Sequence, residues 1–228
     1  MTTQYESIPS EDGRTFKAYV SQPEVPNGHA VIVLQEIFGV TKHVRDIADR
    51  FAEDGYLAYA PDLFWRLEPG VELTHSKEDM QKAFSFVERY DDADGMADIR
   101  STAKHIRALT EFNGKVATAG LCMGGRLAFL AAGLPEVQAS VGFYGVGIEG
   151  QLGVTENLKQ PLMLHFGSED PYVSTGAREQ ITAALSPKKV VIYVYPGANH
   201  GFYTRGSEDD IKLARERTNR FLEHALAG

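Results

Sequence analysis

The sequence predicts an α/β fold, with a mostly parallel twisted sheet and helices on both of its faces. Short apolar runs alternate with longer stretches of helical periodicity along the 228 residues. Most of these runs are apolar at every position, which is typical of strands covered by helices on both sides. Strands and helices that alternate along a chain favour a parallel sheet.

The expected strands are of two kinds. Residues 15–20 alternate polar and apolar side chains, which predicts an early antiparallel strand at the edge of the sheet. The apolar runs occupy residues 30–34, 56–60, 115–119, 139–144, 161–166 and 190–195. Helical patterns occupy residues 41–54, 76–90, 93–109, 123–132, 174–185 and 207–225. Since no linker, repeat or low-complexity tract interrupts this order, we expect a single domain over residues 1–228.

The composition argues against several classes of partner. A formal net charge of −8 without a basic cluster disfavours nucleic acid and anionic membrane surfaces, because both need concentrated Lys and Arg. The single cysteine excludes an intramolecular disulfide and a CxxC metal site. Residues 1–7 lack the basic and apolar segments of a secretory signal, and no apolar stretch reaches the length of a membrane span. We expect a cytoplasmic protein that acts on a small molecule.

The most informative motif is Gly120-Leu-Cys-Met-Gly-Gly125, which joins an expected strand to an expected helix. Gly-x-nucleophile-x-Gly in this position is the nucleophile elbow of the α/β-hydrolase fold, here with a thiol in place of the usual hydroxyl. The turn is so tight that its neighbouring positions scarcely accommodate a Cβ. Cys122 is then expected to be exposed at a helix N-terminus, which favours a thiolate. The alternative is a small buried hydrophobe, as most lone cysteines are.

An acid and a base follow later strands. Asp170 comes after the run 161–166 and His200 after the run 190–195, so both are expected at the carboxyl edge of the sheet. The chain order of nucleophile, acid and histidine is that of α/β-hydrolases. Glu169 is the alternative acid, and either carboxylate could instead cap the helix near Val173.

The other histidines fit a catalytic role less well. His165 falls within an expected buried strand and is interpreted as a core residue. The remaining five lie on surface-like or helical segments: His29, His43, His75, His105 and His224. No second histidine stands at ligand spacing from His200, so we expect no metal site.

A thiolate suits esters and lactones, whose leaving groups are already stable. The backbone N–H groups of Met123 and Ile37 are the expected oxyanion donors, and His200 is expected to deliver water to the thioester. Glu36 is unusual, because a carboxylate near a thiol raises the thiol pKa. It could hold Cys122 protonated at rest or deprotonate it when substrate arrives; the alternative is a loop carboxylate that caps the helix from Thr41.

The pocket walls are less specific. Aromatic residues near strand ends could line an apolar cleft or pack the core, and this set comprises Phe38, Trp65, Tyr144, Phe202 and Tyr203. Residues 63–76 carry Pro and Gly and are expected to act as a lid.

Several motifs together resemble the dienelactone hydrolase (carboxymethylenebutenolidase) family over nearly the whole chain. They are Gln35–Gly39, Pro61–Phe64, Gly120–Gly125, Tyr144–Gly147 and Asn199–Phe202. The resemblance implies a triad of Cys122, His200 and Asp170, with Glu36 controlling thiol ionisation. It also implies a compact monomer that needs no cofactor. Members of this family cleave a conjugated enol-lactone to maleylacetate in the breakdown of chlorinated aromatics.

The chain departs from this family where the substrate carboxylate is held. Met80, Phe84 and Thr204 stand where the family carries Arg, Tyr and Arg. Loss of a bidentate donor weakens carboxylate binding unless another cation replaces it, for which the chain offers Lys77, Lys82 and Arg205. A less anionic ester is therefore an alternative substrate, and a redox-sensing or ligand-binding role for Cys122 is the alternative function.

Overall fold

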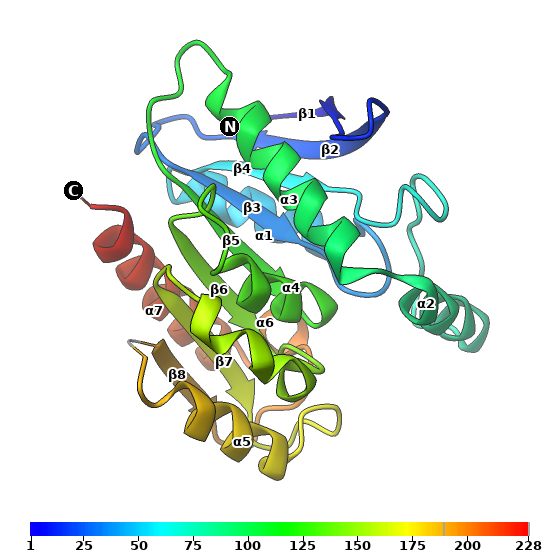
Figure 1. The fold of residues 1–228 in the computed structure, drawn as a ribbon, viewed down its shortest axis with the longest axis vertical. Coiled ribbons are helices and arrows are strands. Elements are labelled where there is room, and N and C mark those ends of the chain that lie inside the picture. The colour runs from blue at the N-terminus through cyan, green and yellow to red at the C-terminus, as the bar shows by residue number, and fades with distance from the viewer. Residues whose placement is uncertain (189, 228) are drawn as a thin grey trace. The chain divides into compact units, whose positions relative to one another are not determined.

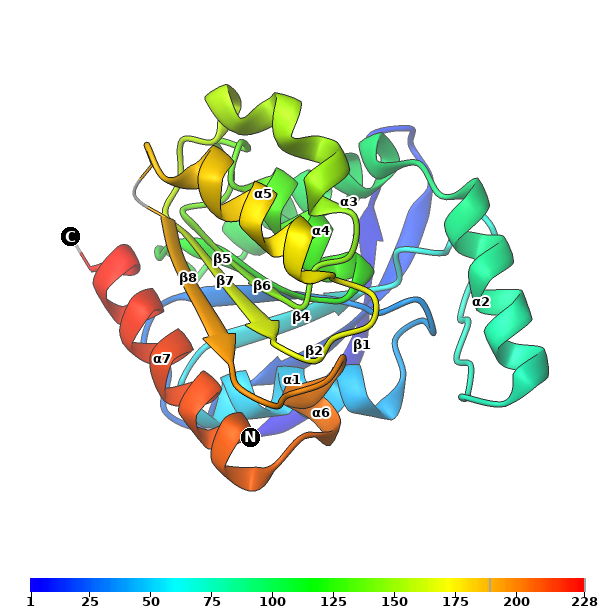
Figure 2. The ribbon, with the colours of Figure 1, turned by 90° about the horizontal axis from the view of Figure 1, so that it is seen from below.

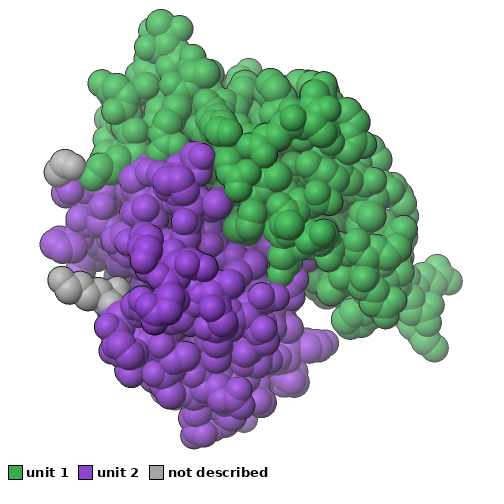
Figure 3. Space-filling view, viewed as in Figure 1, with its two compact units in different colours: residues 1–116 green, residues 117–228 purple. Residues whose placement is uncertain are grey.

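The computed structural model describes residues 1–188 and 190–227. The chain forms two compact units, unit 1 (Met1–Val116) and unit 2 (Ala117–Gly228), which Figure 3 shows in separate colours.

Unit 1 contains four strands in the order β1-β2-β4-β3. They are β1 (Thr2–Pro9), β2 (Thr15–Gln22), β3 (Ala30–Leu34) and β4 (Leu57–Pro61). β1 and β2 pair antiparallel, as do β2 and β4, whereas β3 and β4 pair parallel. Helices α1 (Lys42–Glu53) and α3 (Asp92–Arg107) lie on opposite faces of these strands, and α2 (Lys77–Arg89) stands away from them (Figures 1 and 2).

The early antiparallel strand is confirmed, but its expected place at the sheet edge is wrong. β2 lies between β4 and β1, and β1 was not predicted. Ile8 is the one fully buried side chain of β1, and most of its neighbours are exposed. With a single buried side chain, β1 lacks the regular alternation of apolar and polar residues from which a strand can be predicted.

Unit 2 contains the parallel strands β5-β6-β7-β8. They are β5 (Val116–Leu121), β6 (Ala139–Phe143), β7 (Leu162–Gly167) and β8 (Val190–Tyr195). Helices α4 (Met123–Ala131) and α5 (Thr175–Leu185) lie on one face and α7 (Glu208–Leu226) on the other (Figure 2). β5, β6 and β7 are buried throughout, as predicted. β8 is not: most of its side chains are only half-buried, because within the described chain it pairs on one side alone, with β7.

Two short helices also escaped prediction. A 3-10 helix, η1 (Ile148–Asn157), follows β6, and a single turn of helix, α6 (Phe202–Arg205), follows the loop of His200. With four residues, α6 is too short to show a helical period, and η1 has the three-residue turn of a 3-10 helix rather than the 3.6-residue period of an α-helix. Over residues 1–188 and 190–227, no helix combines the length and the apolar character needed to cross a membrane.

Glycines allow the start of α4 to approach β6 very closely. A Cβ on Gly125 would lie 2.6 Å from the Phe143 carbonyl oxygen and 2.8 Å from the Gly145 Cα. A Cβ on Gly120 would lie 1.8 Å from the Gly124 carbonyl oxygen. Backbone cannot yield at such distances as a flexible side chain can. Side chains are thus excluded on both sides of Cys122, in agreement with the elbow motif.

The structure confirms that His165 is a core residue. It is fully buried in β7, where its Nδ1 is 2.9 Å from the Tyr195 hydroxyl and its Nε2 is 3.3 Å from Thr218 Oγ1. Burial, assisted by the positive charge of Arg217, lowers the pKa of His165 to about 3. Both ring nitrogens have hydroxyl neighbours, so the neutral ring is satisfied without charge.

We expect His165 to make folding stability depend on acidity. Above pH 6.5 the ring is neutral in both states. Between pH 6.5 and 3 the unfolded chain binds a proton that the folded chain does not, so stability falls as pH falls. From pH 7 to pH 5 the wild type should therefore lose about 2 kcal/mol more unfolding free energy than His165→Gln in urea titrations. His224→Gln, at an exposed position, is the control; equal losses for wild type and His165→Gln would contradict the assignment.

We expect Gly125→Ala to destabilise unit 2 by about 3 kcal/mol, because the new methyl group meets backbone on two sides. The measurement is the urea midpoint and slope. Gly150→Ala is the matched control, since no atom lies within 4 Å of a Cβ placed there. If both variants unfold at the same midpoint, the close approach of α4 to β6 is not a tight constraint.

Candidate active site

Cys122 has the strained backbone of an elbow. Its φ of 55° and ψ of −114° place it at the N-cap of α4, and it is one of two non-glycine residues of positive φ in the described chain. Its N–H donates to the Phe143 carbonyl at 3.0 Å, and its own carbonyl accepts from the Gly125 N–H at 2.9 Å. These bonds tie the turn to the end of β6 and to α4. Conformations of this kind persist where surrounding structure enforces them, commonly at functional sites.

The thiol is less exposed than expected. Cys122 retains 9 % of its accessible surface, which is largely buried rather than open. A short side chain on a turn bonded on both sides stays close to the backbone around it. Met123, the next residue, is the first of α4, so its N–H has no acceptor within the helix. The helix N-terminus therefore offers a donor and a partial positive charge directly beside the sulfur-bearing residue.

Asp170 and His200 are hydrogen-bonded. His200 Nδ1 lies 2.8 Å from Asp170 Oδ2, with the acid side chain fully buried and the imidazole 13 % exposed. Asp170 Oδ1 accepts from the N–H groups of Tyr172 and Val173 at 2.8 and 3.3 Å. One oxygen of Asp170 thus closes its own turn and the other binds the histidine. The alternative in which Asp170 caps the following helix is wrong, because Ser174 is the N-cap of α5. Glu169, the alternative acid, is exposed.

The loops of Asp170 and His200 are tied together by their backbones. Ser168 donates its N–H to the Tyr195 carbonyl and Glu169 donates to the Ala198 carbonyl, both at 3.0 Å. The Ser168 hydroxyl accepts from the Gly197 N–H at 2.8 Å. A Cβ on Gly167 would lie 2.3 Å from the Ala198 carbonyl oxygen, so only glycine permits this approach. The acid and the base therefore belong to one hydrogen-bonded assembly.

Two tyrosines contact the imidazole edge-on. The rings of Tyr144 and Tyr172 each have their centroid 4.9 Å from that of His200. Tyr144 has a φ of 41° and donates its N–H to the His165 carbonyl at 2.7 Å. Because it directly follows Phe143, the acceptor of the Cys122 N–H, it connects the cysteine turn to His200. The structure thereby brings the elbow and the His–Asp pair into one continuous set of contacts within unit 2.

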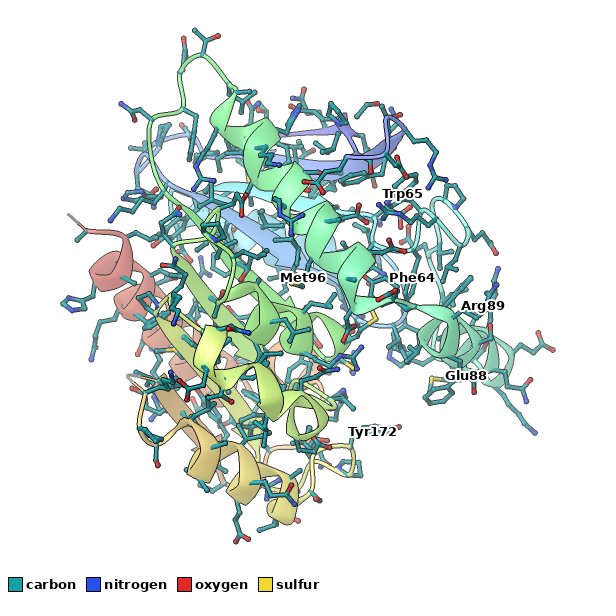
Figure 4. The ribbon with its side chains drawn as sticks, viewed as in Figure 1. Phe64, Trp65, Glu88, Arg89, Met96 and Tyr172 are labelled. Atoms are coloured by element: carbon teal, nitrogen blue, oxygen red, sulfur yellow. The ribbon has the colours of Figure 1, made fainter. Side chains whose placement is uncertain are left out.

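Tyr172 is a site residue that the sequence analysis missed. It is 52 % exposed and follows β7 in the loop of the acid, where Figure 4 labels it. Its position in the sequence, two residues after Asp170, is the feature from which a place near the site could have been predicted.

Phe202 and Tyr203 pack beneath the histidine loop. Phe202 contacts the rings of Tyr144 and Tyr195, and Tyr203 stacks on Phe143 with centroids 4.0 Å apart. Both are buried to 2 % exposure. Phe202 and Tyr203 are therefore packed in the core, which was the alternative to their lining an apolar cleft.

Unit 1 carries Glu36, Ile37 and Phe38 directly after β3. Glu36 is 3 % exposed, Ile37 is half-buried, and the Phe38 ring lies 4.4 Å from that of His75. Glu36 and Phe38 help to line a cavity of about 490 Å³ in this unit, together with residues 41–43 and 72–75. Two carboxylates, an ammonium group, an aromatic ring and two imidazoles thus line one cavity.

Residues 63–76 are tied down within unit 1. The buried Asp62 accepts from the Gly70 N–H at 2.7 Å, and burial raises the pKa of this carboxyl. The Leu73 N–H donates to the Phe38 carbonyl at 2.9 Å, and Arg45 pairs with Glu72 through both of its terminal nitrogens. Any lid motion of this segment has to break these contacts.

Trp65 is engaged elsewhere in unit 1. The indole N–H of Trp65, which Figure 4 labels, donates to Asp98 at 2.9 Å, and the ring stacks on Phe16. The guanidinium groups of Arg14 and Arg66 lie 4.5 and 4.3 Å from the ring centroid. These contacts indicate that Trp65 is packed as part of the structure of unit 1, which agrees with the core-packing alternative for this residue.

The cations expected to meet a substrate carboxylate differ in their placement. Arg205 is exposed, and its guanidinium lies over Gly201, where an added Cβ would be 2.2 Å from a terminal nitrogen. Lys82 pairs with Glu68 at 2.8 Å, and Lys77 is exposed on α2. Phe84 is 45 % exposed on the same helix. Of the three cations, Arg205 is the one that lies against the residue following His200.

Among the described residues, no group of three or more His, Cys, Asp or Glu side chains is arranged to hold a metal ion.

Comparison with known proteins identifies the family. The model of the "Dienelactone hydrolase family" matches residues 16–226. The chain is 36% identical to a putative carboxymethylenebutenolidase of Azospirillum brasilense, over 96% of this chain and 98% of that protein. It is 34% identical to a carboxymethylenebutenolidase of Pseudomonas putida, over 97% of each chain. The crystal structure of a putative dienelactone hydrolase from Klebsiella pneumoniae superposes with a TM-score of 0.83 at 29% identity, over 96% of this chain and 97% of that one.

The match extends over almost the whole chain and includes the elbow, the acid loop and the histidine loop. With its α/β-hydrolase fold and its sequence, this chain belongs to the dienelactone hydrolase family of enzymes.

Proposed function

We propose that this protein hydrolyses lactones or activated esters through an acyl-thioester on Cys122. The observation that carries the proposal is the 2.8 Å hydrogen bond between His200 Nδ1 and the buried Asp170, in the same unit as a strained cysteine at a helix N-terminus. A base oriented by a buried acid is the arrangement that activates a nucleophile.

The reaction takes two steps. In the first, His200 removes the thiol proton, the sulfur of Cys122 attacks the substrate carbonyl carbon, and the imidazolium returns the proton to the departing oxygen. In the second, His200 removes a proton from water, the hydroxide attacks the thioester, and the thiol is restored as the acid product leaves. Asp170 holds the ring in the required tautomer and stabilises the imidazolium in both steps.

The oxyanion of each tetrahedral intermediate needs donors. We assign this role to the backbone N–H groups of Met123 and Ile37, the residue after the nucleophile and a residue of the loop after β3. Support for Met123 comes from its place at the first position of α4. Ile37 is assigned from the family resemblance.

Glu36 is assigned control of thiol ionisation, as the resemblance implies. Its burial and its place directly after β3 agree with a role at the carboxyl edge of the sheet. An enzyme that keeps its thiol protonated until substrate arrives protects it from oxidation, since the thiolate is the reactive form.

The substrate class follows from leaving-group chemistry. A thiolate is itself a good leaving group, so the tetrahedral intermediate reverts unless the other group leaves at least as easily. Enol-lactones and aryl esters meet this condition and amides do not. The exposed guanidinium of Arg205 beside the histidine loop favours a substrate with a carboxylate of its own.

We expect Cys122→Ala to lower kcat for lactones and aryl esters by roughly 10³-fold or more, because the covalent intermediate cannot form. The measurement is steady-state hydrolysis over a panel containing dienelactone and an uncharged aryl ester. Unchanged hydrolysis would end the proposal.

Two further variants sort the roles around the thiol. His200→Gln and Glu36→Gln keep Cys122 and should slow turnover. In the wild type, an acid quench during turnover should trap an acyl adduct on Cys122, visible as a mass increase equal to the acyl group. A cysteine that gains only oxygen in peroxide, with no acyl adduct on any substrate, would favour the redox-sensing alternative.

We expect Arg205→Gln to discriminate substrates by charge. Its KM for dienelactone should rise about tenfold, the effect of losing one exposed charge-assisted contact, while the KM for an uncharged aryl ester stays within twofold. Lys82→Gln is the matched control, because that lysine is paired with Glu68. Equal effects of Arg205→Gln on both substrates would exclude a carboxylate contact.

A further inference from the structure

Arg178 is a buried arginine in the first turns of α5. It is 9 % exposed, and its guanidinium makes four hydrogen bonds. One terminal nitrogen donates to the carbonyls of Gly167 at 3.1 Å and Val173 at 2.6 Å. The other donates to the Ser168 carbonyl at 3.1 Å and the Thr175 hydroxyl at 2.8 Å.

These four acceptors lie on both sides of Asp170 in the sequence. Gly167 and Ser168 precede it and Val173 and Thr175 follow it. The guanidinium therefore links the two ends of the turn that carries the acid. The same turn is closed from inside by Asp170 Oδ1, which accepts from two N–H groups of residues 172 and 173. Both ends and the middle of the turn are fixed by hydrogen bonds, and Oδ2 is left to His200.

Helix stability does not account for this arginine. A cation near a helix N-terminus opposes the helix dipole, and Ser174 already caps α5 by accepting from the Ala177 N–H. Burial of a guanidinium carries a large desolvation cost. All four of these acceptors are neutral, so none of the four hydrogen bonds is an ion pair. A lysine could not replace it, because a single ammonium cannot present two nitrogens in one plane.

We propose that Arg178 is a positioning residue of the active site, which fixes the turn of Asp170 so that its free oxygen meets His200 Nδ1. It acts through the acid and the base and does not touch substrate. The kinetic part of this inference rests on the proposed function, whereas the hydrogen bond that it sets up exists without substrate.

The test combines Arg178→Gln and Arg178→Lys with Thr175→Val, which removes one acceptor only. For Arg178→Gln we expect kcat to fall about 100-fold with KM within threefold, as for a displacement of catalytic groups by about 1 Å. Arg178→Lys and Thr175→Val should fall less. Arg100→Gln, on α3 and paired with Glu11, is the matched control and should keep wild-type kcat.

A second readout needs no substrate. Long-range ¹⁵N–¹H spectra of the histidine rings report the tautomer and hydrogen bonding of His200, whose signals are assigned by their loss in His200→Gln. We expect the Nδ1 signal to shift in each folded Arg178 variant and in Thr175→Val. If Arg178→Gln does not fold, the other two variants carry the test.

The outcomes separate the two proposals. Variants that unfold more easily but keep kcat per folded molecule and an unchanged Nδ1 signal would show a merely structural arginine and overturn the inference. A wild type without hydrolase activity whose Nδ1 signal still shifts on substitution would overturn the proposed function and leave the positioning role supported.

Discussion

The arrangement of unit 2 depends on one hydrogen bond, between a buried carboxylate and a partly exposed imidazole. A carboxylate with no exposure is tolerated only when its oxygens are satisfied. Asp170 meets this condition with two backbone N–H groups on one oxygen and the His200 ring on the other. Removing the ring would leave a buried acceptor without its partner. The acid and the base therefore stabilise each other's position as well as any reaction.

The second constraint is the close approach of two backbone segments, the start of α4 and the end of β6, which fixes the position of Cys122. Three glycines let the start of α4 lie almost in contact with β6 and the residues that follow it: Gly125, Gly142 and Gly145. The turn then bonds to Phe143, and the next residue, Tyr144, contacts the imidazole. Cys122 and Tyr144 lie where the two segments approach each other, and both have the positive φ of a strained backbone. The same tight turn leaves the thiol 9 % exposed, so access to it is restricted by the fold itself.

Sequence reasoning succeeded where a residue's task leaves a local pattern. Buried strands such as β7 appear as apolar runs, and the elbow is recognisable because steric crowding requires glycine at positions 120 and 125. It failed for β1 and α6, since an exposed strand and a four-residue helix leave no periodicity. It also missed Tyr172 and Arg178, because their contacts depend on how the acid loop folds back on α5 rather than on spacing. The pairing of Asp170 with His200 could be predicted from sequence, but only the geometry shows that the second oxygen of Asp170 closes its own turn while Ser174 caps α5.

Arg178 and Arg205 show how exposure separates tasks for one residue type. Arg178 is buried, and its donors are used by carbonyls and a hydroxyl of its own loop, so the group is held in one geometry and is closed to ligands. Arg205 is exposed beside Gly201, where its charge faces solvent. Burial therefore agrees with the positioning role that we propose for Arg178, and exposure agrees with the recognition role that we propose for Arg205.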